Sequence, residues 1–261
     1  MRQRIFIALT ALLLSFATHA HAIRETTLTK PVFLNFSLGT GIKFETGDYD
    51  TEQEVDTWQI PLFIEWSPVQ RLALSLEIPF VYQNISTEPG MIGPGSTEDV
   101  SESGLDDIIF NATGTLLNEK RRTPRLLALL YTKFPTADEQ KGLGTGEFDW
   151  GGGIGIGKKF GDWSTYAEAL YILPGDPEFY PLDNYWEWLA SASFRASASL
   201  RPGISLSGGT AAIAGRDKPL EIKAKLSGLS GELTSYSIYI SRGLSESSPD
   251  WGIGIFGYLD F

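Results

Sequence analysis

Apolar and polar residues alternate with a period of two along most of this chain. Residues 32–44, 57–66 and 72–82 show it most clearly, each with one apolar and one mixed or polar face. A period of two places successive side chains on opposite faces of a β-strand, so these segments are predicted strands. Weaker alternation predicts nine more strands, at residues 105–117, 124–134, 147–160, 163–173, 185–196, 201–214, 219–228, 233–243 and 251–261.

The links between these twelve strands alternate in length. Residues 45–56, 84–104, 135–146 and 174–184 form long links, whereas residues 67–70, 118–123, 161–162, 197–200 and 229–232 form short ones. Outer-membrane β-barrels have short periplasmic turns and longer outer loops, and an even strand count returns both chain ends to the periplasmic side. The pattern therefore favours an all-β fold, a transmembrane antiparallel up-and-down β-barrel of about 12 strands, with 10 to 14 as the range.

Aromatic residues support a membrane barrel over the soluble alternatives, a β-sandwich or a lipocalin-like barrel. They stand near strand ends on the apolar face, where interfacial girdles of membrane barrels lie. A soluble barrel buries its apolar face inside and has no need of such rings. The residues concerned are Phe44, Trp58, Trp66, Tyr82, Phe134, Phe148, Phe160, Trp163 and Trp251.

The first 22 residues have the pattern of a secretory signal peptide. Arg2 and Arg4 precede a short apolar core, and Ala20-His21-Ala22 forms a small-x-small cleavage site. We therefore expect residues 1–22 to be removed and residues 23–261 to form one barrel domain in the outer membrane of a Gram-negative cell. Removing two arginines changes the formal charge from −11 to −13. So acidic a chain is a poor candidate for nucleic-acid binding, which depends on Lys and Arg.

The two histidines, His19 and His21, both lie in the predicted signal, and the chain has no cysteine. Histidine is the commonest general base, and with cysteine it forms most zinc sites. Ser-His-Asp hydrolysis, thiol chemistry and ordinary zinc sites are thereby removed from the mature chain. We expect no enzyme, no cofactor and no catalytic or metal site, although carboxylate-only catalysis is not removed by this argument.

The final strand carries a second indication of a membrane barrel. Its apolar face consists of Trp251, Ile253, Ile255, Leu259 and the terminal Phe261. A strand of this kind resembles the C-terminal strand that the barrel-assembly machinery reads in outer-membrane proteins. In isolation the run favours an ordinary buried strand at a domain end, and the rest of the chain reverses this in favour of the membrane interpretation.

Charged residues alternate with the apolar ones and are predicted to face the lumen. A Lys or Arg facing lipid at the bilayer midplane costs about 2–4 kcal/mol, so the inner face is preferred. Their role is either cross-lumen ion pairing, which we favour, or pore selectivity. The candidates are Lys43, Glu65, Glu77, Asp107, Lys133, Lys159, Glu168, Glu187, Arg195, Lys223, Lys225 and Arg242.

Two further runs imitate ligand-binding motifs. Residues 152–158 match the GxxxxGK start of a phosphate-binding loop, but Lys159 stands where Ser or Thr is required and no strand-then-helix context exists. We interpret this run as a strand whose inward glycines leave lumen space or allow close packing. Residues 45–56 are rich in acidic groups without the offsets of a calcium loop. A solvated outer loop is the preferred interpretation, with weak divalent-cation binding as the alternative.

Five short motifs at residues 103–108, 133–138, 142–146, 159–163 and 173–177 occur in an order that resembles one family. They read SGLDDI, KFPTAD, GLGTG, KFGDW and LPGDP. This order resembles the outer-membrane family linked to the MetA pathway of phenol degradation, although Asp106 and Ala137 stand where that family usually has Gly. The motifs suit turns and strand ends, since Gly161-Asp162 fits a two-residue hairpin and Pro135 ends a strand. The resemblance implies passive entry of aromatic or other hydrophobic compounds.

The sequence leaves three hypotheses for function. The leading one is a passive channel for small hydrophobic or aromatic solutes. The second is a closed structural or adhesion barrel that acts through its acidic outer loops, and the third and weakest is a membrane enzyme. The expected partners are the lipid bilayer with lipopolysaccharide, the barrel-assembly machinery and a small hydrophobic solute. The identity of the solute and the openness of the lumen do not follow from the sequence.

Overall fold

The computed structural model describes residues 36–51, 53–87, 100–177 and 181–261. The predicted signal peptide and the first residues of the predicted strand 32–44 lie outside the described residues. The strands are β1 (Phe36–Gly47), β2 (Gln53–Val69), β3 (Leu72–Thr87), β4 (Val100–Leu105), β5 (Ile108–Leu117), β6 (Arg125–Phe134), β7 (Asp149–Phe160), β8 (Trp163–Leu173), β9 (Tyr185–Phe194), β10 (Leu200–Gly209), β11 (Leu220–Leu229), β12 (Thr234–Gly243) and β13 (Trp251–Asp260). One 3₁₀ turn, η3 (Glu139–Lys141), lies between β6 and β7.

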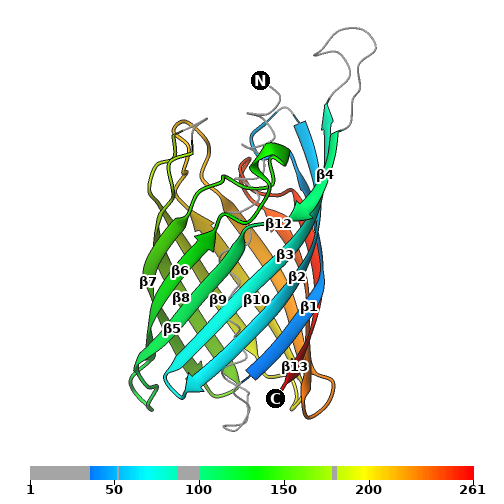
Figure 1. Ribbon diagram of the computed structural model, residues 1–261. Coiled ribbons are helices and arrows are strands. Elements are labelled where there is room, and N and C mark those ends of the chain that lie inside the picture. Colours follow the sequence, from blue (N-terminus) through cyan, green and yellow to red (C-terminus); the bar gives the residue numbers. More distant parts are fainter. Residues whose placement is uncertain (1–35, 52, 88–99, 178–180) are drawn as a thin grey trace.

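These strands close into a single antiparallel barrel (Figure 1). Strands that follow one another in the chain pair, except β4 and β5, and β1 pairs with β13 from Ser37 opposite Asp260 to Thr46 opposite Trp251. The ring has twelve places because β4 and β5 pair with successive stretches of β3 and share one place. The predicted all-β barrel of about 12 strands is confirmed.

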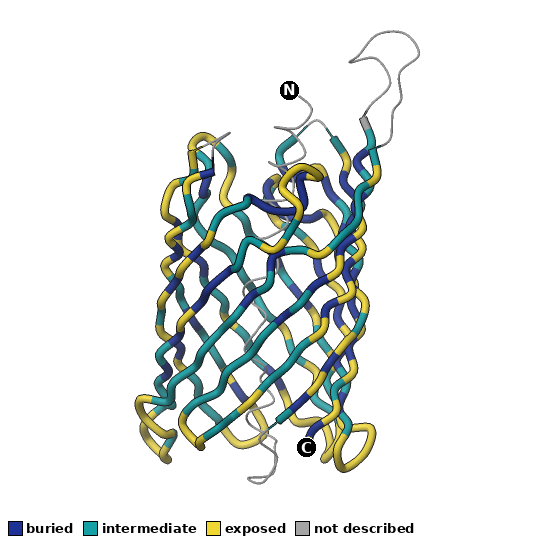
Figure 2. The backbone as a smooth tube through the Cα atoms, viewed as in Figure 1, coloured by how far each residue is buried: buried dark blue, intermediate teal, exposed yellow. Residues whose placement is uncertain are grey.

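Buried and more exposed residues alternate along many of the strands (Figure 2), as expected if successive side chains face the lumen and the outer surface in turn. In β13, Ile253 and Ile255 are about half exposed, whereas Phe256 and Asp260 are buried. Exposed apolar residues on a membrane barrel face lipid, which removes them from water without an internal core. Within the described residues, no helix has the length and hydropathy needed to cross a bilayer.

The two ends of the barrel differ in their connections. We call the end with residues 48–52, 135–148, 174–184, 210–219 and 244–250 the loop end, and the end with residues 70–71, 118–124, 161–162, 195–199 and 230–233 the turn end. Most links of the loop end are longer than those of the turn end, as predicted, but the β1–β2 link, predicted as residues 45–56, is only residues 48–52. At the turn end, Gly161 has φ 63°, and the two-residue hairpin Gly161-Asp162 joins β7 to β8 as the sequence predicted.

The strand boundaries differ from the prediction mainly at the loop end. β2 begins at Gln53 rather than residue 57, and β3 continues to Thr87, opposite Gln53. β4 rises above the rim of the neighbouring strands and pairs with β3 (Figure 1). The strands of a hairpin satisfy their backbone hydrogen bonds by pairing with each other, so the hairpin continues beyond the apolar part of its strands. The sequence pattern predicted only that apolar part.

The predicted single strand 105–117 is interrupted at Asp106 and Asp107. The Asp106 N–H donates to the carbonyl of Pro79 (2.9 Å), and Asp107 turns its carboxylate inward. Below this break, Ile108 pairs with Phe134 of β6, whereas above it the described pairing of β4 is with β3. The break therefore lies where β6 ends and the chain leaves the barrel wall.

Exposed aromatic rings form two groups by their place along the strands. The group near the loop end contains stacked or tilted pairs such as Phe44 with Trp58, at 4.6 Å between ring centroids. The group near the turn end includes Trp163 with Phe194, at 5.1 Å. Two levels of rings on the lipid face are the girdles that the sequence predicted.

Candidate functional site: the barrel lumen

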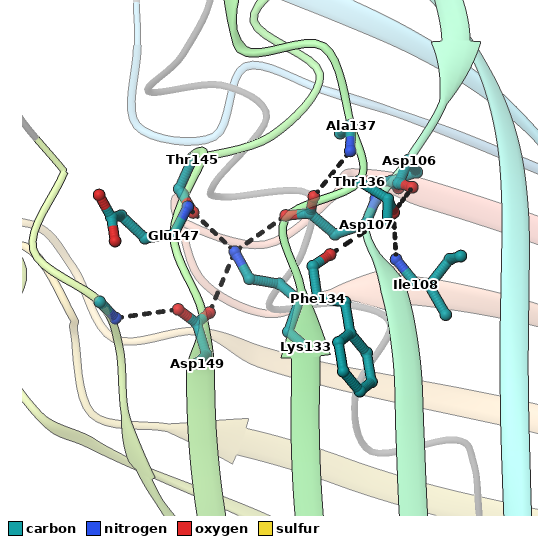
Figure 3. Close-up of polar contacts among 11 residues, drawn as sticks. Asp106, Asp107, Ile108, Lys133, Phe134, Thr136, Ala137, Thr145, Glu147 and Asp149 are labelled. Atoms are coloured by element: carbon teal, nitrogen blue, oxygen red, sulfur yellow. Dashed lines mark hydrogen bonds and ion pairs between the residues drawn. The ribbon is translucent and has the colours of Figure 1, made fainter.

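A buried ion-pair network closes the lumen wall near the loop end (Figure 3). The Lys133 ammonium lies 2.9 Å from Asp107 and 3.1 Å from Asp149, and it donates to the Thr145 hydroxyl at 2.7 Å. These groups come from the break just before β5, from β6 and β7, and from the loop before β7. Every charged member is at least 95% buried, so the two carboxylates depend on this one cation for compensation.

The same network holds the β6–β7 loop against the strand break. The Ala137 N–H donates to Asp107 at 3.0 Å, and the Thr136 hydroxyl accepts from the Ile108 N–H at 2.9 Å. Lys141 of η3 donates to the carbonyl of Ser103 at 3.0 Å. The motifs at 103–108 and 133–138 thus supply strand-end and loop contacts, as their residue types predicted, and the partner of Asp107 is Lys133 from the second motif.

A second charged cluster lies on β1 and β11. Lys43 lies 3.0 Å from Glu45, and Lys223 lies 3.7 Å from Glu221, all four side chains being buried. The Lys223 ammonium also lies 4.2 Å from the centre of the Tyr239 ring, a cation–π contact that contributes about 0.5–2 kcal/mol. The alternation of β1 had indicated Lys43 but not its pairing along the strand.

The β1–β2 loop turns Tyr49 toward this cluster. Tyr49 is fully buried, and both Tyr49 and Asp50 have left-handed backbone angles, φ 51° and 60°. Burial, and then the nearby Glu45 and Glu221 carboxylates, raise the pKa of the Tyr49 hydroxyl well above its usual value. Asp50 pairs with Arg216 of the β10–β11 loop at 3.4 Å, which fastens the turn. The sequence had indicated only an acidic loop here, because a single tyrosine carries no periodicity.

The glycines of β7 line the lumen side of that strand and are covered by neighbouring side chains. A Cβ on Gly151 would lie 2.4 Å from Ile172, and one on Gly155 would lie 2.6 Å from the Tyr166 hydroxyl. A Cβ on Gly153 would lie 2.0 Å from the backbone oxygen of Ala169. The glycines therefore allow close packing, and the rings from β6 and β8 lie against the wall. This is one of the two structural roles predicted for the run, and no phosphate-binding loop exists here.

A matching arrangement occurs at β1. Gly39 and Gly41 have no side chains, so Phe63 of β2 reaches across β1 to Phe256 and Tyr258 of β13. The ring centroids of these two pairs lie 5.8 and 5.9 Å apart. β13 and β7 stand opposite each other in the ring, with five places between them on either side. Two opposite parts of the lumen wall thus present aromatic rings laid against glycine.

Most of the predicted lumen candidates occupy the inner face. Glu77, Glu168 and Glu187 are buried there, and the Tyr166 hydroxyl donates to Glu168. Three more of the predicted candidates, Glu65, Lys159 and Lys225, also lie on the inner face, where they are half-buried. Whether any of them sets selectivity stays a prediction.

Two candidates are not on the inner wall. Arg242 lies on the outer face of β12 with Ile238 and Ile240, and its guanidinium lies 4.6 Å from the centre of the Trp251 ring. It stands one residue from the end of the strand, where a cation reaches the interface and its position costs little. Arg195 follows the last residue of β9 and is exposed in the turn, because that strand ends at Phe194 rather than residue 196.

The apolar face of the last strand points outward. Trp251, Ile253, Ile255 and Leu259 alternate with buried residues and are exposed on the lipid side. The backbone of Phe261 pairs with Phe36, whose carbonyl accepts the Phe261 N–H at 2.8 Å. This geometry closes the barrel, and recognition of the strand by the assembly machinery stays a prediction.

Comparison with known proteins places this geometry among outer-membrane barrels. The crystal structure of the COG4313 outer membrane channel from Pseudomonas putida F1 matches with a TM-score of 0.71 at 14% identity, covering 89% of this chain and 97% of that one. The translocator domain of the autotransporter NalP from Neisseria meningitidis matches at 0.62 with 8% identity, covering 97% of each chain. The CymD monoaromatic hydrocarbon channel matches at 0.51 with 8% identity, covering 94% of each.

At these identities the structures show the fold, an outer-membrane β-barrel. No curated protein sequence matches this chain. A family model described as "Putative MetA-pathway of phenol degradation" matches residues 62–210, which is more than half of the chain and contains all five short motifs. The chain therefore belongs to the MetA-pathway phenol-degradation family.

Proposed function

We propose that this barrel is a passive channel of the outer membrane for small hydrophobic solutes, aromatic ones included. The observation that carries the proposal is the pair of opposite wall regions where rings lie against glycine. Tyr166 over Gly155 and Tyr258 over Gly39 present aromatic faces rather than charges to the lumen. Aromatic solutes gain about 0.5–1.5 kcal/mol from such ring contacts beyond their apolar area.

The family and the fold of two matching structures support this proposal. The matching barrels from Pseudomonas putida and the CymD structure are both described as channels, the latter for monoaromatic hydrocarbons. A passive channel needs no catalytic group, in keeping with a chain whose two histidines both fall in the predicted signal peptide. Export through that signal peptide, and folding by the barrel-assembly machinery, belong to the same proposal.

The test is uptake into liposomes that contain the refolded barrel. Two solutes of similar size are compared, a simple phenolic and a neutral sugar, and protein-free liposomes correct for leakage of the phenolic. Faster uptake of the phenolic alone supports a hydrophobic channel, whereas equal uptake of both indicates a general pore. Uptake of neither favours the second candidate, a closed barrel acting through its acidic loops.

A variant pair tests the contribution of the aromatic wall. Tyr258→Ala removes an inward ring of β13, and the matched control Tyr236→Ala removes an outward tyrosine of the adjoining β12. We expect the first to lower the ratio of phenolic to sugar uptake several-fold and the second to leave it unchanged. Equal ratios in both variants would contradict the role of the wall.

A further inference from the structure

Cationic side chains gather on one side of the lumen at the turn end. Arg125 is the first residue of β6, Lys159 is the last but one of β7, and Arg201 is the second of β10. Each has the inward parity of its strand, and Arg201 donates to the buried Ser164 at 3.2 Å. Arg195, in the β9–β10 turn, lies beside them.

These cations act on one another. The charges that act most strongly on Lys159 are three cations, Arg125, Arg195 and Arg201, and one anion, Glu119. The Glu119 carboxylate already binds the Lys158 ammonium and the Lys159 N–H, each at 2.9 Å. The arc formed by Arg125, Lys159, Arg195 and Arg201, hereafter the cationic arc, therefore has a positive local potential.

The acidic residues close to the cationic arc are Glu119, which binds Lys158, the exposed Asp162 of the β7–β8 hairpin, and Glu168, which accepts the Tyr166 hydroxyl. Other acidic residues of the inner wall toward the turn end lie further around the ring. Glu65 belongs to β2, and Asp260 belongs to β13 and accepts the hydroxyl of Ser37. Neither strand adjoins β6, β7 or β10 in the ring. A charged wall of one sign in a low-dielectric channel raises the local concentration of the opposite ion by about 10-fold to 1000-fold. The cationic arc should thus attract anions.

An aromatic face adjoins the cationic arc. The Tyr166 ring lies over Gly155 and Gly157, and its hydroxyl is within electrostatic reach of Arg125. On the other side of Arg201, the residues that line a shallow recess include Arg201, Lys225, Ser227 and Ser235. Cations, hydroxyl donors and a flat ring thus occur within one side of the lumen.

We propose that the cationic arc and the Tyr166 ring form a binding site for small aromatic carboxylates on the way out of the channel. The carboxylate pairs with Arg125, Lys159 or Arg201, since guanidinium groups bind carboxylates with two parallel hydrogen bonds. The aromatic ring of the solute stacks on Tyr166. This inference rests on the proposed channel function and adds a preference, among aromatic solutes, for those that carry a negative charge.

The test compares benzoate with benzamide, which share a ring and differ in charge at neutral pH. Uptake into barrel-containing liposomes is measured for the unaltered protein, for K159Q/R201Q, and for R121Q/R122Q as control. The control removes two exposed cations of the same end, from the 118–124 turn. We expect K159Q/R201Q to lower benzoate uptake about tenfold and to leave benzamide uptake unchanged. The R121Q/R122Q control should behave as the unaltered protein.

Loss of both uptakes together, or loss of neither, would overturn the proposal. A second measurement separates it from the channel function. Benzoate that binds the folded barrel raises its Tm, so the unaltered protein should be stabilised by benzoate more than by benzamide, and K159Q/R201Q should not. If neither solute crosses the membrane, the channel proposal fails, and the Tm comparison alone then decides whether the anion site exists.

Discussion

The two ends of the lumen treat buried charge in opposite ways. At the loop end, Lys133 lies between Asp107 and Asp149 and is in ion-pair contact with both. At the turn end, Lys159 has three cations and one carboxylate around it. Paired charges stabilise the barrel wall. A cluster of charges of mostly one sign produces an electrostatic potential that attracts solutes of the opposite charge. The comparison separates the part of the lumen that supports the barrel from the part that can select.

The connections at the two ends of the barrel also differ in charge. The described residues of the loop end are mostly acidic, with Asp48, Asp50, Asp138, Glu139, Glu147, Asp176, Asp183, Asp217, Glu246 and Asp250 against Lys141, Arg216 and Lys218. The turn end carries Arg71, Lys120, Arg121, Arg122 and Arg195 against Glu119, Asp162 and Glu232. The barrel is therefore electrically polar along its axis, which distinguishes its two mouths.

The largest expected effect is at the loop end. Lys133→Met keeps the length of the side chain but leaves Asp107 and Asp149 buried without their cation. We expect the free energy of unfolding to fall by about 3–5 kcal/mol, because an uncompensated buried charge is costly. Urea titration of the refolded barrel measures it. Lys158→Met, which breaks a half-exposed pair at the turn end, should cost less than about 1 kcal/mol. Equal losses would remove the distinction between the two ends.

A substitution in the barrel wall between the two ends should have a smaller effect on the free energy of unfolding. An alanine Cβ at Gly153 would lie 2.0 Å from the Ala169 carbonyl oxygen, whereas at the outward Gly152 the nearest atom is 3.8 Å away. We expect Gly153→Ala to lower the free energy of unfolding by about 1–3 kcal/mol, through overpacking. Gly152→Ala should show no such loss. Similar urea midpoints for the two variants would mean that close packing on β7 does not matter.

The smallest effect is a pH dependence at the turn end. Burial raises the pKa of the Glu119 carboxyl, but the Lys159 N–H and the Lys158 ammonium lower it more, so the net pKa lies below its usual value. A carboxyl with a lowered folded pKa stabilises the fold above its unfolded pKa of about 4.3, and this contribution is lost as the pH falls through the folded pKa. The urea midpoint should therefore decrease on acidification below that range.

Glu119→Gln is the matched control for this pH dependence. The variant cannot ionise at this position, so it should lack the part of the acid-induced decrease that belongs to Glu119. If the variant and the unaltered protein lose the same stability between neutral and acidic pH, Glu119 is not responsible.

Alternation alone was enough to find the barrel and most of its inner face. Some charged residues alternate with apolar neighbours, and the cost of a charge in lipid places them on the lumen face. These residues are Lys43, Glu77, Glu168 and Glu187. The prediction placed Arg242 on the inner face because of its charge, although it lies on the same outer face of its strand as Ile238 and Ile240. The rule that charged residues face the lumen depends on the cost of placing a charge in lipid at the middle of the bilayer. At a strand end this cost is small, because the side chain reaches the membrane–water interface.

The pairing of residues was beyond the sequence. Lys133 is 26 residues from Asp107 and 16 from Asp149, and no local pattern connects them. The inward turn of Tyr49 and the contact of Phe63 with Phe256 across β1 are likewise set by closure of the barrel.

The sequence by itself therefore determined the fold class, the strand order and the face of most residues, because these depend on a period of two and on a solvent that penalises exposed charge. The tertiary structure alone decided which charges lie beside opposite charges and which lie close to like charges. That outcome depends on the register between strands distant in the chain, which closes β1 on β13 and brings Lys159 beside Arg201.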